Sequence, residues 1–81
     1  MDGEKLLPDY MGRGVGKVLF QSVVAELMKM GYRNIYLWVL EENLRARRFY
    51  EKEGFSGTDD YLYDNIGGKD VREIRYIYRV R

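Results

Sequence analysis

The chain has 81 residues, a formal net charge of +1, and 46% hydrophobic and 33% charged residues, which is the range of one small globular domain. This balance gives no support for a nucleic-acid partner selected by bulk charge. Cysteine and histidine are both absent, which excludes disulfides, thiolate nucleophiles, histidine relays and zinc sites built from these residues.

No stretch resembles a signal peptide, and the longest apolar run, at 35–40, is far too short to cross a bilayer. We therefore expect a cytoplasmic protein that needs no membrane, no nucleic acid and no metal.

The first half of the chain predicts a strand, a helix and a second strand. A short apolar stretch, "KLL", ends at Pro8 and closes the first strand. A loop and helix then occupy 8–30, and Gly31 ends the helix. The apolar face of this helix is Leu19, Phe20, Val23, Val24, Leu27 and Met30, with Gly16 projecting to its middle. Residues 34–41, "NIYLWVLE", are apolar on both faces, which predicts a central strand covered on both sides.

The second half predicts a helix and a hairpin. Asn43 is a suitable N-cap for a helix over 43–53. This helix buries Ala46, Phe49 and Tyr50, and it allows Arg47 and Glu51 to pair on its exposed side. Residues 57–80 predict an antiparallel hairpin around Gly67-Gly68. The order β-α-β-α-β-β indicates an α/β fold with a mixed sheet and helices on its faces, beginning with a parallel βαβ unit.

Glycines occupy alternate positions 12, 14 and 16 in "YMGRGVGKVLF", between the first strand and its helix. The first N–H groups of a helix have no intrahelical partners and carry partial positive charge. Residues without Cβ allow a phosphate to approach several such amides together. With Arg13 and Lys17 as nearby cations, the pattern predicts a pyrophosphate cradle. A flexible strand-to-helix turn is the alternative interpretation.

Spacing excludes two better-known glycine motifs. A P-loop requires glycine at position 11 and serine or threonine at position 18, where the chain has Met11 and Val18. A dinucleotide fingerprint requires glycine where Lys17 stands, and no acidic residue follows at the required distance.

Two stretches of the sequence resemble motifs of a known protein family. "GRGVGK" resembles the end of the acyl-CoA loop of GCN5-related N-acetyltransferases, and "VLEENLRARRFYEKEGF" resembles the next block of their domain. The resemblance covers nearly the whole chain and implies the second half of an acyl-CoA N-acyltransferase-like fold. Met11 departs from the glutamine or arginine usual in that loop.

The resemblance implies a set of residues that bind acetyl-CoA as cosubstrate. Backbone amides of the loop would hold the pyrophosphate, the strand end would pair with the pantetheine arm, and Asn43 would contact the pantetheine or phosphate region. Tyr50 would lie near the thioester sulfur as the candidate general acid. The implied loop and strand residues are Leu6, Leu7, Met11, Gly12, Arg13, Gly14, Val15, Gly16 and Lys17.

In this family an amine attacks the thioester directly, so a chain without cysteine or histidine is compatible with the reaction. A phenol and a thiol differ by about 1.5 pKa units, so full proton transfer to the leaving thiolate is uphill by roughly 2 kcal/mol. We therefore expect Tyr50 to act through a strong hydrogen bond or a tuned pKa. The alternative interpretation is a core tyrosine on a helix.

The base and the acceptor amine cannot be named from the sequence. Glu41 and Glu42 follow the central strand, where α/β sites often open, but two charges before a helix also stabilise its N-terminus. Tyr61, Tyr63, Tyr76 and Tyr78 suit an acceptor pocket or simple cross-strand packing. The "RARR" stretch is a solvated face from which one arginine can reach a coenzyme 3′-phosphate.

The family's N-terminal strands and helices have no counterpart in these 81 residues. Apolar area on the central strand and first helix would then be open, so we expect a homodimer that covers the sheet edge. Two function classes follow: an acetyl-CoA-dependent N-acetyltransferase acting on a primary amine, or its coenzyme-binding half; and a non-catalytic acyl-CoA-binding or interaction module.

Overall fold

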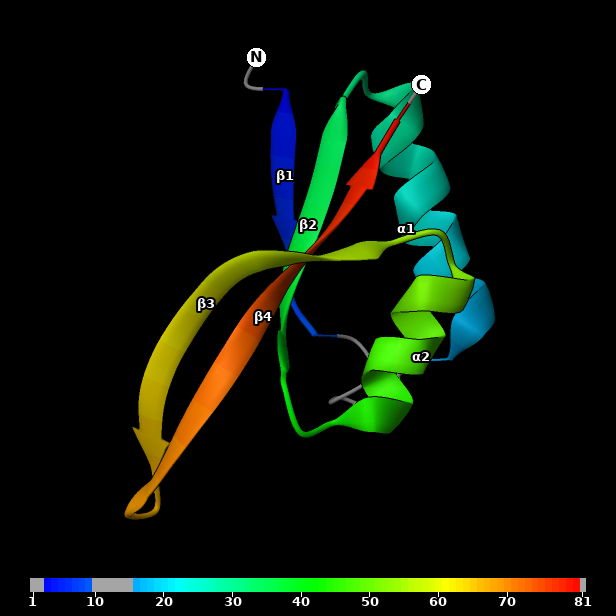
Figure 1. Cartoon of the computed structure of the whole chain (residues 1–81). Helices are drawn as coiled ribbons and strands as arrows, with labels where there is room; N and C mark the ends of the chain where they lie inside the picture. The colour runs from blue at the N-terminus through cyan, green and yellow to red at the C-terminus, as the bar shows by residue number, and fades with distance from the viewer. Residues whose placement is uncertain (1–2, 10–15, 81) are drawn as a thin grey trace.

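A computed structural model of the chain describes residues 3–9 and 16–80. The elements follow the predicted order (Figure 1): β1 (Glu4–Leu7), α1 (Lys17–Lys29), β2 (Asn34–Leu40), α2 (Leu44–Lys52), β3 (Ser56–Ile66) and β4 (Lys69–Arg79).

The four strands form one mixed sheet in the order β1-β2-β4-β3. β1 and β2 are parallel, as a βαβ unit requires, while β4 runs antiparallel to both β2 and β3. The parallel pairing ends where Leu7 lies opposite Leu37, although β2 continues to Leu40. We call the place where this pairing ends, between the end of β1 and the continuing β2, the wedge.

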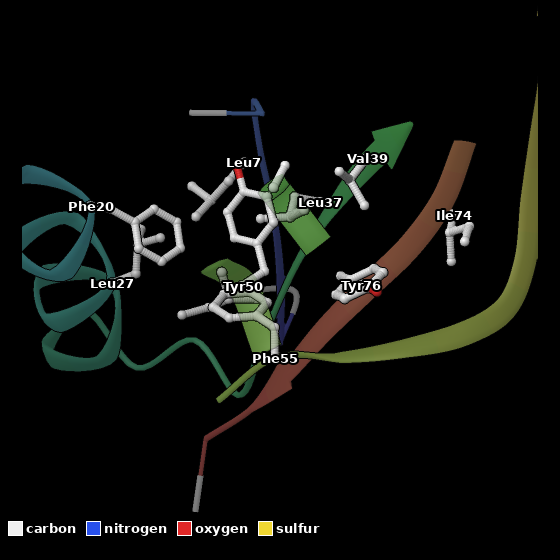
Figure 2. Close-up of a cluster of buried hydrophobic side chains, with 11 residues drawn as sticks. Leu7, Phe20, Leu27, Leu37, Val39, Tyr50, Phe55, Ile74 and Tyr76 are labelled. Atoms are coloured by element: carbon white, nitrogen blue, oxygen red, sulfur yellow. The ribbon is translucent and has the colours of Figure 1, made fainter. Parts of the chain in front are cut away.

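Both helices lie on the same side of the sheet (Figure 1). The central strand turns Ile35, Leu37 and Val39 toward them, and all three are fully buried. Rings from the helices and the following turn pack on this face, as Figure 2 shows. The remaining core residues are Leu7, Phe20, Leu27, Ala46, Tyr50, Phe55, Ile74 and Tyr76.

The opposite face of β2 is open, whereas the sequence predicted that it would be covered. Tyr36, Trp38 and Leu40 are half-buried, and no described helix lies on their side of the sheet (Figure 1). A shallow hollow of about 410 Å³ opens there, lined by Tyr36, Trp38, Asp60, Tyr61 and Arg75. The central strand is interior within the sheet, but one of its faces remains open in the described part of the chain.

The predicted apolar face of α1 is wider than the face that packs. Phe20 and Leu27 are buried, whereas Leu19 and Met30 are 55% and 52% exposed. Both exposed residues project to one edge of the apolar arc, roughly 60–100° from its packed centre, so the sheet does not reach them. Gly16 precedes the helix as its N-cap and does not lie on the packed face.

Both helices end in a glycine with a positive φ, as predicted. Gly31 follows α1 with φ +94° and Gly54 follows α2 with φ +95°. At the end of α2, the Gly54 N–H donates to the Glu51 carbonyl and the Phe55 N–H to the Tyr50 carbonyl. This pair of bonds is the Schellman motif, which needs a left-handed residue that glycine adopts without strain.

The predicted hairpin forms between β3 and β4, with Gly67 and Gly68 at positive φ in the turn. Its register shifts between Gly57 and Tyr61, leaving three residues of β3 opposite Arg75. The Thr58 hydroxyl donates to the Arg75 carbonyl at 2.9 Å, and Asp60 forms an ion pair with the Arg75 guanidinium at 2.5 Å. Local side chains thus replace the ladder bonds lost at the irregularity.

Candidate functional site

The N-terminus of α1 has no side-chain cap. Gly16 is the N-cap residue, in extended conformation with φ −74° and ψ 160°, and no acidic residue occupies the first turn. A Cβ added at Gly16 would meet no described atom within 4 Å. The first bond of the helix runs from the Phe20 N–H to the Gly16 carbonyl, so the N–H groups of residues 17–19 have no intrahelical acceptor. An anion at this end would find N–H donors and the positive end of the dipole.

Lys17 lies at this helix end with its side chain 66% exposed. Its Nζ atom is 3.9 Å from the Glu53 carboxylate, which also accepts a hydrogen bond of 2.8 Å from Gln21. The distance is long and the lysine side chain is well solvated, so this ion pair is weak and Lys17 can turn toward another anion.

Five predicted loop residues, Met11, Gly12, Arg13, Gly14 and Val15, lie outside the described residues. Their role in a pyrophosphate cradle stays a prediction.

Leu6 and Leu7 are the last two residues of β1, opposite Tyr36 and Leu37. The Leu7 side chain is buried, while Leu6 is 50% exposed. They stand where the parallel pair ends and the wedge opens. The predicted pairing of their backbone with an extended ligand remains a prediction.

Tyr50 joins α2 to the end of β1. Its ring is fully buried and lies 5.5 Å from the Phe20 ring and 6.0 Å from the Phe55 ring. Its hydroxyl donates to Asp9 Oδ1 at 2.5 Å, and Figure 2 shows the ring inside the core cluster. Tyr50 is therefore a core residue whose ring is buried and whose hydroxyl binds Asp9 at the wedge.

Asn43 caps α2 as predicted, because its Oδ1 atom accepts a hydrogen bond of 3.1 Å from the Ala46 N–H. The structure records no bond from its Nδ2 group to a described residue. The predicted contact of Asn43 with the ligand would use this remaining donor.

Glu41 and Glu42 bind basic side chains of β4 instead of the N-terminus of α2. Glu41 forms an ion pair with Arg72, and Glu42 lies 3.1 Å from Lys69. The hydrogen bond to Glu41 raises the pKa of Arg72 above its ordinary value. Both carboxylates are thus partnered.

Arg47 and Glu51 do not pair directly but meet at the Tyr76 hydroxyl. Arg47 Nε donates to this oxygen at 3.0 Å, and the hydroxyl donates to Glu51 at 2.7 Å. Burial raises the pKa of Tyr76, and the bond from Arg47 opposes that rise. Tyr76 therefore links α2 to β4, while Tyr61 stands at the hollow on the other face.

Asp9 is the residue of this region that the sequence patterns did not indicate. It follows Pro8 directly after a strand whose carboxyl end faces the site. Ligand-binding residues of α/β folds often follow the carboxyl end of a parallel strand. The place of Asp9 directly after β1 is therefore the sequence signal that could have indicated it as a site residue.

The family model "Acetyltransferase (GNAT) family" matches residues 6–55, more than half of the chain. The chain belongs to this family. The match includes Leu6 and Leu7 of β1, Asp9, α1, β2 and Tyr50. The residues of β3 and β4 described above, Tyr61, Lys69, Arg72 and Tyr76, lie outside the matched segment.

Curated relatives of this GNAT chain include N-acetyltransferases. A [ribosomal protein bS18]-alanine N-acetyltransferase of Haemophilus influenzae is 37% identical over 76 residues, covering 90% of this chain and 51% of the relative. The Escherichia coli protein of that name is 37% identical over 49 residues, covering 60% and 33%. An uncharacterized N-acetyltransferase of Methanocaldococcus jannaschii is 42% identical over 48 residues, covering 59% and 21%. The chain spans about half or less of the length of these relatives.

Solved structures of acetyltransferases share the fold. Arabidopsis thaliana NAA60 in complex with a bisubstrate analogue superposes with a TM-score of 0.76 at 23% identity, covering 96% of this chain and 50% of that one. The same protein in complex with acetyl-CoA gives a TM-score of 0.72 at 24% identity, covering 93% and 48%. This GNAT chain thus has the α/β architecture of about half of an acetyltransferase domain.

Two absences hold for residues 3–9 and 16–80. No helix among them is long and apolar enough to span a membrane. No group of three or more acidic side chains there is arranged to hold a metal ion.

Proposed function

We propose that this chain binds acetyl-CoA and transfers its acetyl group to a primary amine by direct attack of the amine on the thioester. The observation that carries the proposal is the N-terminus of α1, which has no side-chain cap. The Phe20 ring of the same helix lies 5.5 Å from the ring of Tyr50, whose hydroxyl binds Asp9 just beyond the end of β1. Family membership and the acetyl-CoA complex of a structural neighbour support the same ligand.

Each part of this arrangement matches one part of the coenzyme. The diphosphate would accept hydrogen bonds from the first amides of α1. The pantetheine arm would extend along the end of β1, next to Leu6 and Leu7. The thioester would then lie in the wedge close to the Tyr50 hydroxyl, which stabilises charge developing on sulfur. Attack by a neutral amine needs no covalent enzyme intermediate.

The acceptor we propose to test first is the α-amine of a peptide that begins with alanine. Two relatives at 37% identity are named as alanine N-acetyltransferases acting on a ribosomal protein. An amine panel should therefore contain an Ala-initiated peptide, the same peptide with a blocked N-terminus, a lysine side-chain amine and a small polyamine.

A thiol-release assay with this panel tests the proposal. We expect saturable release of coenzyme A that requires the Ala-initiated peptide and is lost with the blocked peptide. Binding of acetyl-CoA without thiol release for any amine would instead support a non-catalytic acyl-CoA-binding module. Absence of both binding and release would contradict the proposed function altogether.

We also propose that two copies associate. β1 is an edge strand whose outer side pairs with no described strand, and edges of this kind tend to be covered in native assemblies. Leu6 is 50% exposed there, and Tyr36 and Trp38 stand half-buried on the open face. Sedimentation equilibrium at micromolar concentration should give a homodimer. A well-folded monomer would contradict this association.

A further inference from the structure

The contact between Tyr50 and Asp9 links two residues that are 41 positions apart in the chain. Tyr50 comes from α2 and has no exposed surface, and Asp9 follows β1 and is half-buried. Their oxygens lie 2.5 Å apart, the short distance of a hydrogen bond that a hydroxyl donates to a carboxylate. The Tyr50 hydroxyl is the donor of this bond and the Asp9 carboxylate is its acceptor.

The pair stands at the wedge where the site opens. Asp9 is two residues beyond Leu7, the last β1 residue paired with β2. Carboxyl ends of parallel strands are where α/β proteins place their ligands. If the thioester lies there, as the proposed function requires, Asp9 is one hydrogen bond away from the group that faces the sulfur.

Other carboxylates around α2 have partners away from Tyr50. Glu41 pairs with Arg72, Glu42 with Lys69, and Glu51 accepts a bond from Tyr76. Among the described contacts, Asp9 is the carboxylate that meets the Tyr50 hydroxyl. It therefore fills the role of base that the sequence patterns left unassigned.

We propose that Asp9 and Tyr50 form a proton-transfer pair that moves one proton from the attacking amine to the leaving sulfur. The amine lone pair forms the C–N bond, and the C–S bond breaks with its electron pair on sulfur. In the resting pair the Tyr50 proton is donated to Asp9. When the nitrogen gives one proton to the Asp9 carboxylate, this hydrogen bond reverses, and Asp9 becomes the donor to the Tyr50 oxygen. Tyr50 then turns its own hydroxyl proton to sulfur and receives the Asp9 proton in its place. The products are the amide and the free thiol, and both side chains end as they began.

This pairing removes a difficulty that Tyr50 faces alone. Proton transfer from a phenol to a thiolate is uphill, so an isolated tyrosine would have to become a phenolate. Asp9, once it has taken the amine proton, supplies a proton to the phenol oxygen as the first one leaves. No phenolate accumulates, and the acid and base functions of the reaction share one hydrogen bond.

The test compares single-turnover acetyl transfer to the Ala-initiated peptide in four proteins: wild type, Asp9→Asn, Tyr50→Phe and the double variant. Asp9→Asn keeps the shape and an oxygen acceptor but removes the ability to hold a proton. Asp59→Asn is the matched control, because it makes the same change at an exposed aspartate of β3. Calorimetry measures acetyl-CoA affinity for each protein, and circular dichroism checks that each is folded.

We expect Asp9→Asn to slow the chemical step about 100-fold while acetyl-CoA affinity changes less than about threefold. The double variant should be no slower than the slower single variant, because both residues act in one relay. Asp59→Asn should match wild type. A rate for Asp9→Asn within threefold of wild type, or single effects that multiply in the double variant, would overturn the relay.

A measurement on the wild type alone keeps the test independent of folding in the variants. In mixtures of H₂O and D₂O, the rate of the chemical step should depend on deuterium content along a curve, since more than one proton moves. A linear dependence would overturn the relay and leave the proposed acetyl transfer in place. Acetyl-CoA binding with no thiol release for any amine would overturn both.

Discussion

Replacement of Gly54 by alanine is expected to remove about 2–5 kcal/mol from the free energy of unfolding. Two costs add at this position. The backbone has φ +95°, a conformation that costs an L-residue roughly 1–2 kcal/mol. The new Cβ would also lie 2.9 Å from Cε2 of the half-buried Tyr78 ring, and overpacking of this kind typically costs about 1–3 kcal/mol.

Tyr78 has little room to move away from such a Cβ. Its ring packs on Phe55 at a centroid distance of 5.4 Å, and Phe55 packs in turn on Phe20 and Tyr50. Displacement of Tyr78 would therefore disturb the ring cluster that joins both helices to the sheet. For a chain of this length, total stability is about 4–12 kcal/mol, so the loss is a large fraction of it.

Gly31→Ala is the matched control for this change. Gly31 ends α1 with φ +94° and the same two Schellman bonds, but a Cβ there would meet no described atom within 4 Å. Only the conformational cost remains, about 1–2 kcal/mol. Urea unfolding of both variants separates the two costs. Equal losses at the two glycines would contradict the packing account of Gly54.

Local signals in the sequence were sufficient to predict the elements and their ends. Gly31 and Gly54 stand where each helix stops, Asn43 where the second helix begins, and Gly67-Gly68 where the hairpin turns. Each of these residues acts through its own backbone or the next few amides, so neighbouring sequence contains the information. The resemblance to the acetyltransferase family was confirmed by the family model that matches residues 6–55.

Features that depend on distant partners were not predictable in this way. Leu19 and Met30 fit the helical apolar period, yet no described element covers them. Arg47 and Glu51 are spaced for a helical pair, but the Tyr76 hydroxyl from β4 lies between them. Asp9 meets Tyr50 because α2 packs over the end of β1, which no local pattern around Asp9 encodes.

Replacement of Gly16 by aspartate is expected to stabilise the chain and weaken acetyl-CoA binding at the same time. Aspartate is a better N-cap than glycine and complements the helix dipole, which together contribute about 0.5–1 kcal/mol. The structure accommodates the change, because Gly16 has an ordinary extended conformation and open space around the position of a Cβ. The aspartate side chain would therefore cap the N-terminus of α1.

The same substitution is expected to weaken acetyl-CoA binding. A capping carboxylate accepts hydrogen bonds from the amides that the diphosphate would use, and it repels that anion at short range. We expect affinity for acetyl-CoA to fall at least about tenfold, or 1.4 kcal/mol. Gly16→Asn separates the two effects, because asparagine caps the helix without a negative charge.

Calorimetric titration of acetyl-CoA into wild type, Gly16→Asn and Gly16→Asp, with thermal unfolding of the same three samples, tests the central claim most directly. The diphosphate site at the start of α1 predicts that affinity falls in that order, while the melting temperatures of both variants equal or exceed that of wild type. Undiminished affinity in a folded Gly16→Asp protein would show that the coenzyme binds elsewhere.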